Sequence, residues 1–178
     1  LGGGRGIVHH FGLQGKIDAE VGTLSKAFGV IGGVVAGKKL VVDFVNAHGR
    51  AYQFSTATTP ADTAACIAAI DILEESSDLV DRLWENTQYF KDGMSKAGFN
   101  LSISQTPIVP IILGDDNLAK QFSNKLFEAG VFSASQTFPI VAKGAARVRV
   151  MNSASHSRQD LDYALQAFET VGKNLGII

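Results

Sequence analysis

Gly22-Thr23-Leu24-Ser25-Lys26-Ala27-Phe28-Gly29, followed by Gly32-Gly33, is the most informative stretch of the sequence. Lys26 has two hydroxyl side chains within three residues, no acidic neighbour, and glycines that let other groups approach the backbone. An amine in such a setting is suited to Schiff-base chemistry. Thr23 lies one tight bend or helical turn before Lys26, so its hydroxyl is placed to bond an anion held beside the amine, which fits the phosphate ester of pyridoxal. The alternative is a solvated lysine in a glycine-rich turn.

Two other site chemistries are excluded by spacing. Gly32, Gly37 and Lys38 match a P-loop, but Lys39 stands where that motif needs the hydroxyl that contacts magnesium. The histidines are scattered and do not have metal-ligand spacing, so we expect no metal site. They are His9, His10, His48 and His156.

A second candidate site lies in the segment Arg147-Val148-Arg149-Val150. In a strand, alternation places both arginines on one face. An arginine held on a strand binds a substrate carboxylate well through its two-pronged guanidinium. A solvated strand face with paired charges is the alternative from these residues alone.

Composition indicates a globular protein with a substantial core: 178 residues, 46% hydrophobic, with a net charge of −1. Balanced charge argues against nucleic acid or an anionic membrane surface as partner. No apolar run approaches the roughly 20 residues that span a bilayer. Cys66 is the single cysteine, so a reducing compartment and a cytoplasmic location are expected. Leu1 is not a methionine and no signal peptide follows, so we expect a processed fragment or an omitted upstream region.

The chain changes character near Pro60. Residues 1–60 are rich in glycine and short apolar segments, whereas alternating helices and strands follow, which predicts an α/β fold. Helices are expected over 61–76, 78–97, 117–129 and 158–175, and strands over 99–104, 108–113, 131–135 and 147–151.

Several segments, taken in order, resemble the α-oxoamine synthases, which are pyridoxal-phosphate-dependent acyl-CoA:amino-acid C-acyltransferases. The matching segments are Gly4-Arg5-Gly6, His10-Phe11-Gly12, the 22–27 motif, Gly32-Gly33, Tyr52-Gln53-Phe54-Ser55-Thr56, Arg147-Val148-Arg149 and Ser155-His156-Ser157. The resemblance covers essentially the whole chain. It implies the fold-type I architecture of pyridoxal-phosphate enzymes, with residues 1–60 completing the large cofactor domain and residues 61–178 forming the small C-terminal α/β domain.

The resemblance also implies roles for individual residues. Lys26 would form the Schiff base with pyridoxal 5′-phosphate and later move the proton at the amino-acid α-carbon. Thr23 would bond the cofactor phosphate, and Arg149 the amino-acid carboxylate. Ser55 and Thr56 resemble the pair that reaches the phosphate of the neighbouring subunit's cofactor, which implies a homodimer with shared active sites.

Within the family, residues 83–87 and 171–178 look most like glycine C-acetyltransferase, which joins glycine and acetyl-CoA to give 2-amino-3-ketobutyrate and CoA. The alternative is 8-amino-7-oxononanoate synthase of biotin synthesis, which differs in the acyl group accepted. Family members also carry an upstream aspartate for the pyridine nitrogen and a glycine-rich phosphate-binding helix start, which have no match here. We therefore expect the C-terminal half of the enzyme, and a further alternative is a non-catalytic fragment.

Overall fold

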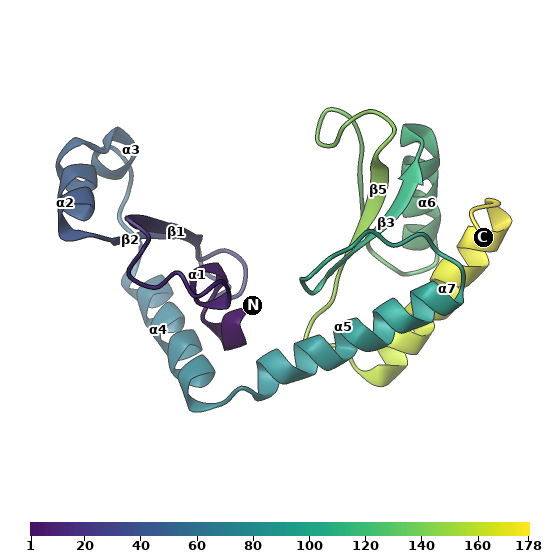
Figure 1. Cartoon of the computed structure of the whole chain (residues 1–178), viewed down its shortest axis with the longest axis horizontal. Helices are drawn as coiled ribbons and strands as arrows, with labels where there is room; N and C mark the ends of the chain where they lie inside the picture. Colours follow the sequence, from purple (N-terminus) through teal and green to yellow (C-terminus); the bar gives the residue numbers. More distant parts are fainter. The chain divides into compact units, whose positions relative to one another are not determined.

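The computed structural model describes residues 1–178 and divides them into two compact units, Leu1–Ser77 and Asp78–Ile178 (Figure 1). This division falls later in the chain than the expected boundary after residue 60, because the helix Pro60–Glu75 groups by its contacts with the first unit. The assignment of the two parts to a large and a small domain stays a prediction. No helix is both long enough and apolar enough to span a bilayer.

The first unit is built around a two-stranded antiparallel sheet. Its strands pair in register, with Ala19 opposite Gly37 and Thr23 opposite Gly33. In chain order the elements are η1 (Gly2–Gly4), α1 (Ile7–His10), β1 (Ala19–Thr23), β2 (Gly33–Gly37), α2 (Lys39–His48), α3 (Arg50–Gln53) and α4 (Pro60–Glu75). The loop between β1 and β2 carries Lys26. Helix α4 begins as predicted, with the Thr59 side chain accepting a hydrogen bond from the Asp62 N–H and Pro60 in the first turn.

The first unit has almost no hydrophobic core of its own. Only Leu24 and Val30 are buried among its apolar side chains. Leu40 and Phe44 of α2 and Phe54 after α3 remain 81%, 63% and 81% exposed. Apolar surface on this scale marks a face that another part of a protein covers.

The second unit is a three-stranded antiparallel sheet with strand order β3-β5-β4, packed with three helices (Figure 1). Its elements are α5 (Asp78–Lys96), β3 (Ile108–Gly114), α6 (Asp116–Glu128), β4 (Ala134–Gln136), β5 (Ala146–Met151) and α7 (Arg158–Asn174). The four predicted helices lie within two residues of those observed. The strand expected over 99–104 is reduced to an isolated bridge between Leu101 and Ile111.

All of the continuous hydrophobic core lies in the second unit. Phe90, Phe122 and Phe168, one from each helix, meet edge to face, with Phe168 5.7 Å from each of the other two ring centroids. Fully buried side chains of β3 and β5, such as Ile111 and Val148, pack against these rings. Alternation along β5 then leaves Arg147 and Arg149 on the opposite face of the sheet.

Candidate functional site

The Lys26 turn, residues 23–32, is a short loop closed by its own backbone hydrogen bonds. The Leu24 N–H donates to the Gly32 carbonyl at 2.9 Å, and the Val30 N–H donates to the Leu24 carbonyl at 3.1 Å. Leu24 and Val30 are the two buried residues of this unit, so they anchor the loop while Lys26 between them is exposed. Gly32 has a φ of 102°, a conformation that side-chain-bearing residues rarely adopt. The turn therefore presents the lysine amine on a locally fixed backbone.

Two hydroxyl groups lie together in this turn. Thr23 Oγ1 and Ser25 Oγ are 2.8 Å apart, and the Ser25 N–H donates to Thr23 Oγ1 at 3.3 Å. Thr23 Oγ1 also donates to the Gly32 carbonyl at 3.4 Å. The structure thus brings the predicted Thr23 together with Ser25, which sequence reasoning quoted in the motif but did not select. The sequence feature that could have identified Ser25 is its two-residue spacing from Thr23, which places both side chains on one side of an extended segment.

Ser55 and Thr56 lie between α3 and α4 and are exposed. The Ser55 hydroxyl donates to the Ala51 carbonyl of α3, and no hydrogen bond joins Ser55 or Thr56 to the Lys26 turn. The same segment nevertheless approaches that turn at Thr58, whose hydroxyl would lie 3.6 Å from a Cβ placed on Gly32. Within one chain the pair does not reach Lys26. Their role toward a neighbouring subunit stays a prediction.

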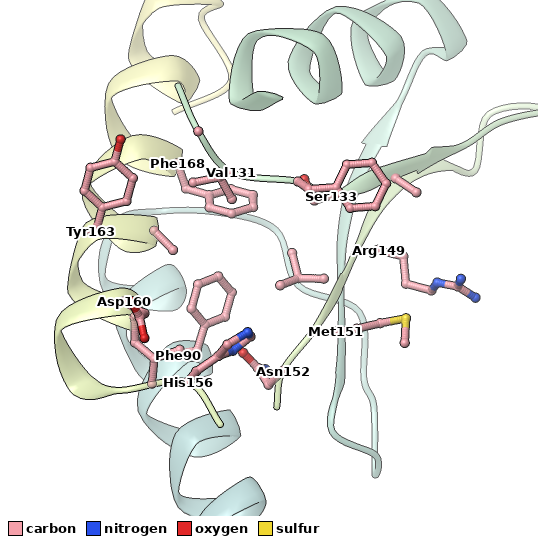
Figure 2. A pocket seen from close by; sticks show the side chains of 16 residues that line it. Phe90, Val131, Ser133, Arg149, Met151, Asn152, His156, Asp160, Tyr163 and Phe168 are labelled. Atoms are coloured by element: carbon pink, nitrogen blue, oxygen red, sulfur yellow. The ribbon is translucent and has the colours of Figure 1, made fainter. Parts of the chain in front are cut away.

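Arg149 lies in the second unit, on the middle strand of its sheet. It stands opposite Pro110 of β3 and Ala134 of β4. Figure 2 shows its side chain directed away from Phe90 and His156, which lie on the helix side of β5. Its Nε is buried and has no hydrogen-bond partner, and no carboxylate forms an ion pair with it. A guanidinium in this state is suited to a bound carboxylate, because a buried donor without a partner is costly.

The neighbouring Arg147 is in a different state. Its Nε donates to the Ala145 carbonyl at 3.0 Å, so part of its donor capacity is used within the protein. Of the two arginines singled out from the sequence, the geometry favours Arg149 as the anion-binding residue.

A cavity of about 670 Å³ lies along the end of β5, where its lining includes Arg149 and Met151 as well as residues of α5 and α7 (Figure 2). Phe90 and Phe168 contribute apolar walls, and His156 and Ser133 contribute polar groups. The Ser133 hydroxyl is buried without a partner. His156 Nδ1 accepts a hydrogen bond from the Ser153 N–H at 3.3 Å, which leaves Nε2 as the donor nitrogen of the neutral ring. This cavity was not foreseen from the sequence, since its walls come from segments far apart in the chain.

Comparison with known proteins places this geometry in a family. The model of the family described as aminotransferase class I and II matches residues 2–168. Over 176 residues the chain is 56% identical to the 8-amino-7-oxononanoate synthase of Fervidobacterium nodosum, which covers 99% of this chain and 45% of that protein. The enzyme of the same name from Thermosipho melanesiensis is 55% identical over 175 residues, covering 98% of this chain and 45% of that protein. The chain thus spans less than half the length of these relatives.

A solved structure supports the same conclusion for the fold. The serine palmitoyltransferase of S. paucimobilis, determined with bound PLP, superimposes with a TM-score of 0.90 at 28% identity, covering 99% of this chain and 45% of that one. The expected fold-type I architecture of pyridoxal-phosphate-dependent transferases is therefore confirmed.

The same comparisons correct the expected activity. The sequence segments 83–87 and 171–178 were interpreted as favouring glycine C-acetyltransferase, and this prediction is wrong. Relatives that match the chain at 55–56% identity over nearly its whole length are named 8-amino-7-oxononanoate synthase, which was the alternative. The two segments misled because they belong to the amphipathic helix α5, which buries Asn86 and Thr87, and to the C-terminus. Packing against the common core constrains such positions more than the choice of acyl group does.

Proposed function

The chain belongs to the class I and II aminotransferase family, and from this premise we propose that it supplies the lysine, phosphate-binding and carboxylate-binding residues of an 8-amino-7-oxononanoate synthase. The cofactor is pyridoxal 5′-phosphate, as the sequence predicted. When bound, this cofactor withdraws electrons from the α-carbon of an amino acid and so eases the loss of a group from that carbon.

The observation that carries the proposal is the donor set of the Lys26 turn, which fits this cofactor. Lys26 supplies the amine, and the hydroxyls of Thr23 and Ser25, 2.8 Å apart, supply two neighbouring donors for a phosphate ester. The two hydroxyls now hydrogen-bond each other, and the Thr23 hydroxyl also bonds the Gly32 carbonyl. Turning toward a phosphate would replace these weak neutral bonds with stronger charge-assisted ones. In this proposal Lys26 holds the cofactor and then carries the proton at the α-carbon.

Arg149 is proposed to orient the amino acid. Its buried, unpartnered Nε and its place on the middle strand of the sheet present a rigid donor to a carboxylate. Holding the carboxylate fixes which bond at the α-carbon is broken. Arg149 would thereby act through substrate placement rather than through proton transfer.

The substrate class follows from the structure of the product that the relatives' name specifies. In 8-amino-7-oxononanoate the bond between the keto carbon and the amine-bearing carbon joins two fragments. One fragment is a seven-carbon acyl group ending in a carboxylate, and the other is an amine-bearing carbon with one methyl group. The second fragment corresponds to alanine without its carboxylate. We therefore propose that alanine and a seven-carbon dicarboxylic acyl thioester combine, with the carboxylate leaving as carbon dioxide and the thiol leaving from the acyl group.

A homodimer with shared active sites is part of the same proposal. It is supported by Ser55 and Thr56, which are exposed and do not contact the Lys26 turn of their own chain, and by the exposed apolar side chains around them.

The test is turnover by the complete enzyme that contains these residues, supplied with pyridoxal phosphate. We expect the amino ketone and carbon dioxide to form from alanine and the dicarboxylic thioester, and much less product from glycine and acetyl-CoA. Mass spectrometry identifies the product. Faster turnover of glycine with acetyl-CoA would contradict the assignment of substrates, and the absence of any condensation would contradict the activity.

A further inference from the structure

Asn86 connects helix α5 to a loop that is distant in sequence. It is one of three polar residues in the chain that are almost fully buried, with 6% of its surface exposed. Its Nδ2 donates to the carbonyls of Ser153 at 3.0 Å and His156 at 2.9 Å, which lie 67 and 70 residues later. A primary amide has two N–H donors, and both are used here. These bonds fasten the loop to the helix.

The fastened loop is residues 152–156, which join strand β5 to helix α7. It is also braced internally, because the His156 N–H donates to the Ser153 carbonyl and the Ser153 N–H donates to His156 Nδ1, both at 3.3 Å. The next residue, Ser157, caps α7. Asn86 therefore holds a compact turn rather than a loose segment.

This turn follows the part of β5 where support from the sheet ends. Arg149 is the last residue of β5 that has partners on both sides, since β4 begins at its partner Ala134. The ladder with β3 ends two residues later, at the pair Met151 and Ile108. Beyond that pair, the Asn152 Nδ2 donates to the Pro107 carbonyl at 3.4 Å, a long bond, and the two shorter bonds from Asn86 then hold the Ser153 and His156 carbonyls. The position of the Arg149 end of the strand thus depends on the sheet before it and, after it, on the Asn152 contact and on Asn86.

We propose that Asn86 is a positioning residue for Arg149, holding the end of β5 so that the guanidinium meets the amino-acid carboxylate. The inference rests on the proposed role of Arg149 in substrate binding. Loss of the two amide donors would free the 152–156 turn and loosen the strand end. The carboxylate contact is then weakened, whereas the chemistry at Lys26 is untouched. A defect of this kind raises the KM for the amino acid more than it lowers kcat.

The experiment is Asn86→Asp in the complete enzyme, a nearly isosteric change that turns the donor into an acceptor facing two carbonyls. We expect the KM for the amino acid to rise about tenfold or more, kcat to stay within about threefold, and the KM for the acyl thioester to stay unchanged. Thr87→Val is the matched control. Thr87 is buried beside Asn86 on the same helix, but its hydroxyl bonds only the Leu83 carbonyl of that helix. The control should leave both KM values unchanged.

Amide hydrogen exchange at residues 152–156 provides a readout that does not depend on activity. Exchange should speed up in Asn86→Asp and not in Thr87→Val. Faster exchange with an unchanged amino-acid KM would overturn the positioning role while leaving the proposed function intact. Unchanged exchange would overturn the anchoring itself. A wild-type enzyme without amino-acid-dependent turnover would instead contradict the proposed function, and the exchange data would still decide the anchor. If Asn86→Asp does not fold, Asn86→Ala removes both donors without adding a charge and should show the same changes.

Discussion

Arg147 and Arg149 project from the same face of strand β5, but Arg147 Nε is bonded to the Ala145 carbonyl at 3.0 Å whereas Arg149 Nε is buried without a partner. The alternating pattern alone presents the two arginines as equivalent, and only the resemblance to the family favoured Arg149. In the structure they differ in the hydrogen-bond donors that remain unused. The substrate-binding role of Arg149 can therefore be tested against Arg147 as an internal control.

Arg149→Leu should lower kcat/KM for the amino acid by about 2–4 kcal/mol, because the substrate carboxylate then enters a site without its charged partner. Arg147→Leu should cost much less, because this residue is already bonded to the protein. Steady-state kinetics of the two variants in the complete enzyme checks both statements. A large effect of Arg147→Leu beside a neutral Arg149→Leu would mean that the two roles are exchanged.

Lys26→Ala should abolish turnover and the visible absorbance of lysine-bound pyridoxal phosphate, with thermal stability nearly unchanged. The stability expectation follows from the exposure of Lys26, whose side chain forms no hydrogen bond or ion pair within the protein. Lys16→Ala, at another exposed lysine, is the control and should retain both colour and rate. An active, yellow Lys26→Ala enzyme would contradict the assignment of Lys26 as the cofactor-binding lysine.

Ser25→Ala tests the residue that the sequence did not select. If both hydroxyls of the turn bond the cofactor phosphate, loss of one should weaken pyridoxal phosphate binding by about 1–2 kcal/mol, or about five- to thirtyfold in Kd. Thr23→Val should act in the same direction. Spectral titration measures both constants. A Ser25→Ala enzyme with wild-type affinity would show that Ser25 only supports Thr23 within the loop.

The long amphipathic helices were predictable from the sequence, because their apolar residues recur at helical spacing and capping residues or glycines mark where they begin or end. Residues 158–175 were expected to be helical, and α7 runs from Arg158 to Asn174. Helix α2 was missed: its Lys39–His48 segment is short and contains four β-branched or aromatic residues, so local preference alone is weak. The strand expected over 99–104 fails because only Leu101 finds a partner. Pairing is a tertiary event that alternation alone does not guarantee.

In the candidate site, too, some features could be predicted from local sequence and others depend on tertiary packing. Lys26 and Thr23 could be selected because the whole motif is local in sequence. Arg149 was selected over Arg147 through the resemblance to the family, whereas the residues alone left the two equivalent. The physical difference between them depends on the backbone at Ala145, and the Asn86 anchor depends on carbonyls nearly seventy residues away. The alternating pattern does not contain that information, because it arises only when the helices and the sheet pack.

The start of helix α7 should make stability depend on pH in acid. Hydrogen bonds from the Ser157 hydroxyl at 2.7 Å and the Ser157 N–H at 2.8 Å lower the pKa of Asp160 below its usual value. A lowered pKa in the folded state means that this stabilisation is present above the unfolded-state pKa, near pH 4, and is lost as pH falls through the folded-state pKa. Asp160→Asn should therefore be less stable than wild type at pH 7, and the two melting temperatures should converge as pH falls below the unfolded-state pKa and through the folded-state pKa. If the difference in melting temperature between the two proteins stays constant as pH falls, ionisation of the Asp160 carboxylate is not its cause.

The two units should differ in whether they fold alone. The continuous core, including Phe90, Phe122 and Phe168, lies within residues 78–178, so a polypeptide of that range should unfold cooperatively as a monomer. Residues 1–77 bury only Leu24 and Val30 among their apolar side chains and leave Leu40 and Phe54 about four-fifths exposed. We therefore expect residues 1–77 to lack a cooperative transition and to associate.

We also expect residues 1–178 to bind pyridoxal phosphate weakly, since a Schiff base to Lys26 is reversible and the turn offers only two hydroxyls for the phosphate. Circular dichroism melts, a sizing column and spectral titration make the comparison. A monomeric, cooperatively folded 1–77 peptide, or tight stoichiometric cofactor binding by residues 1–178, would show that the first unit is complete in itself.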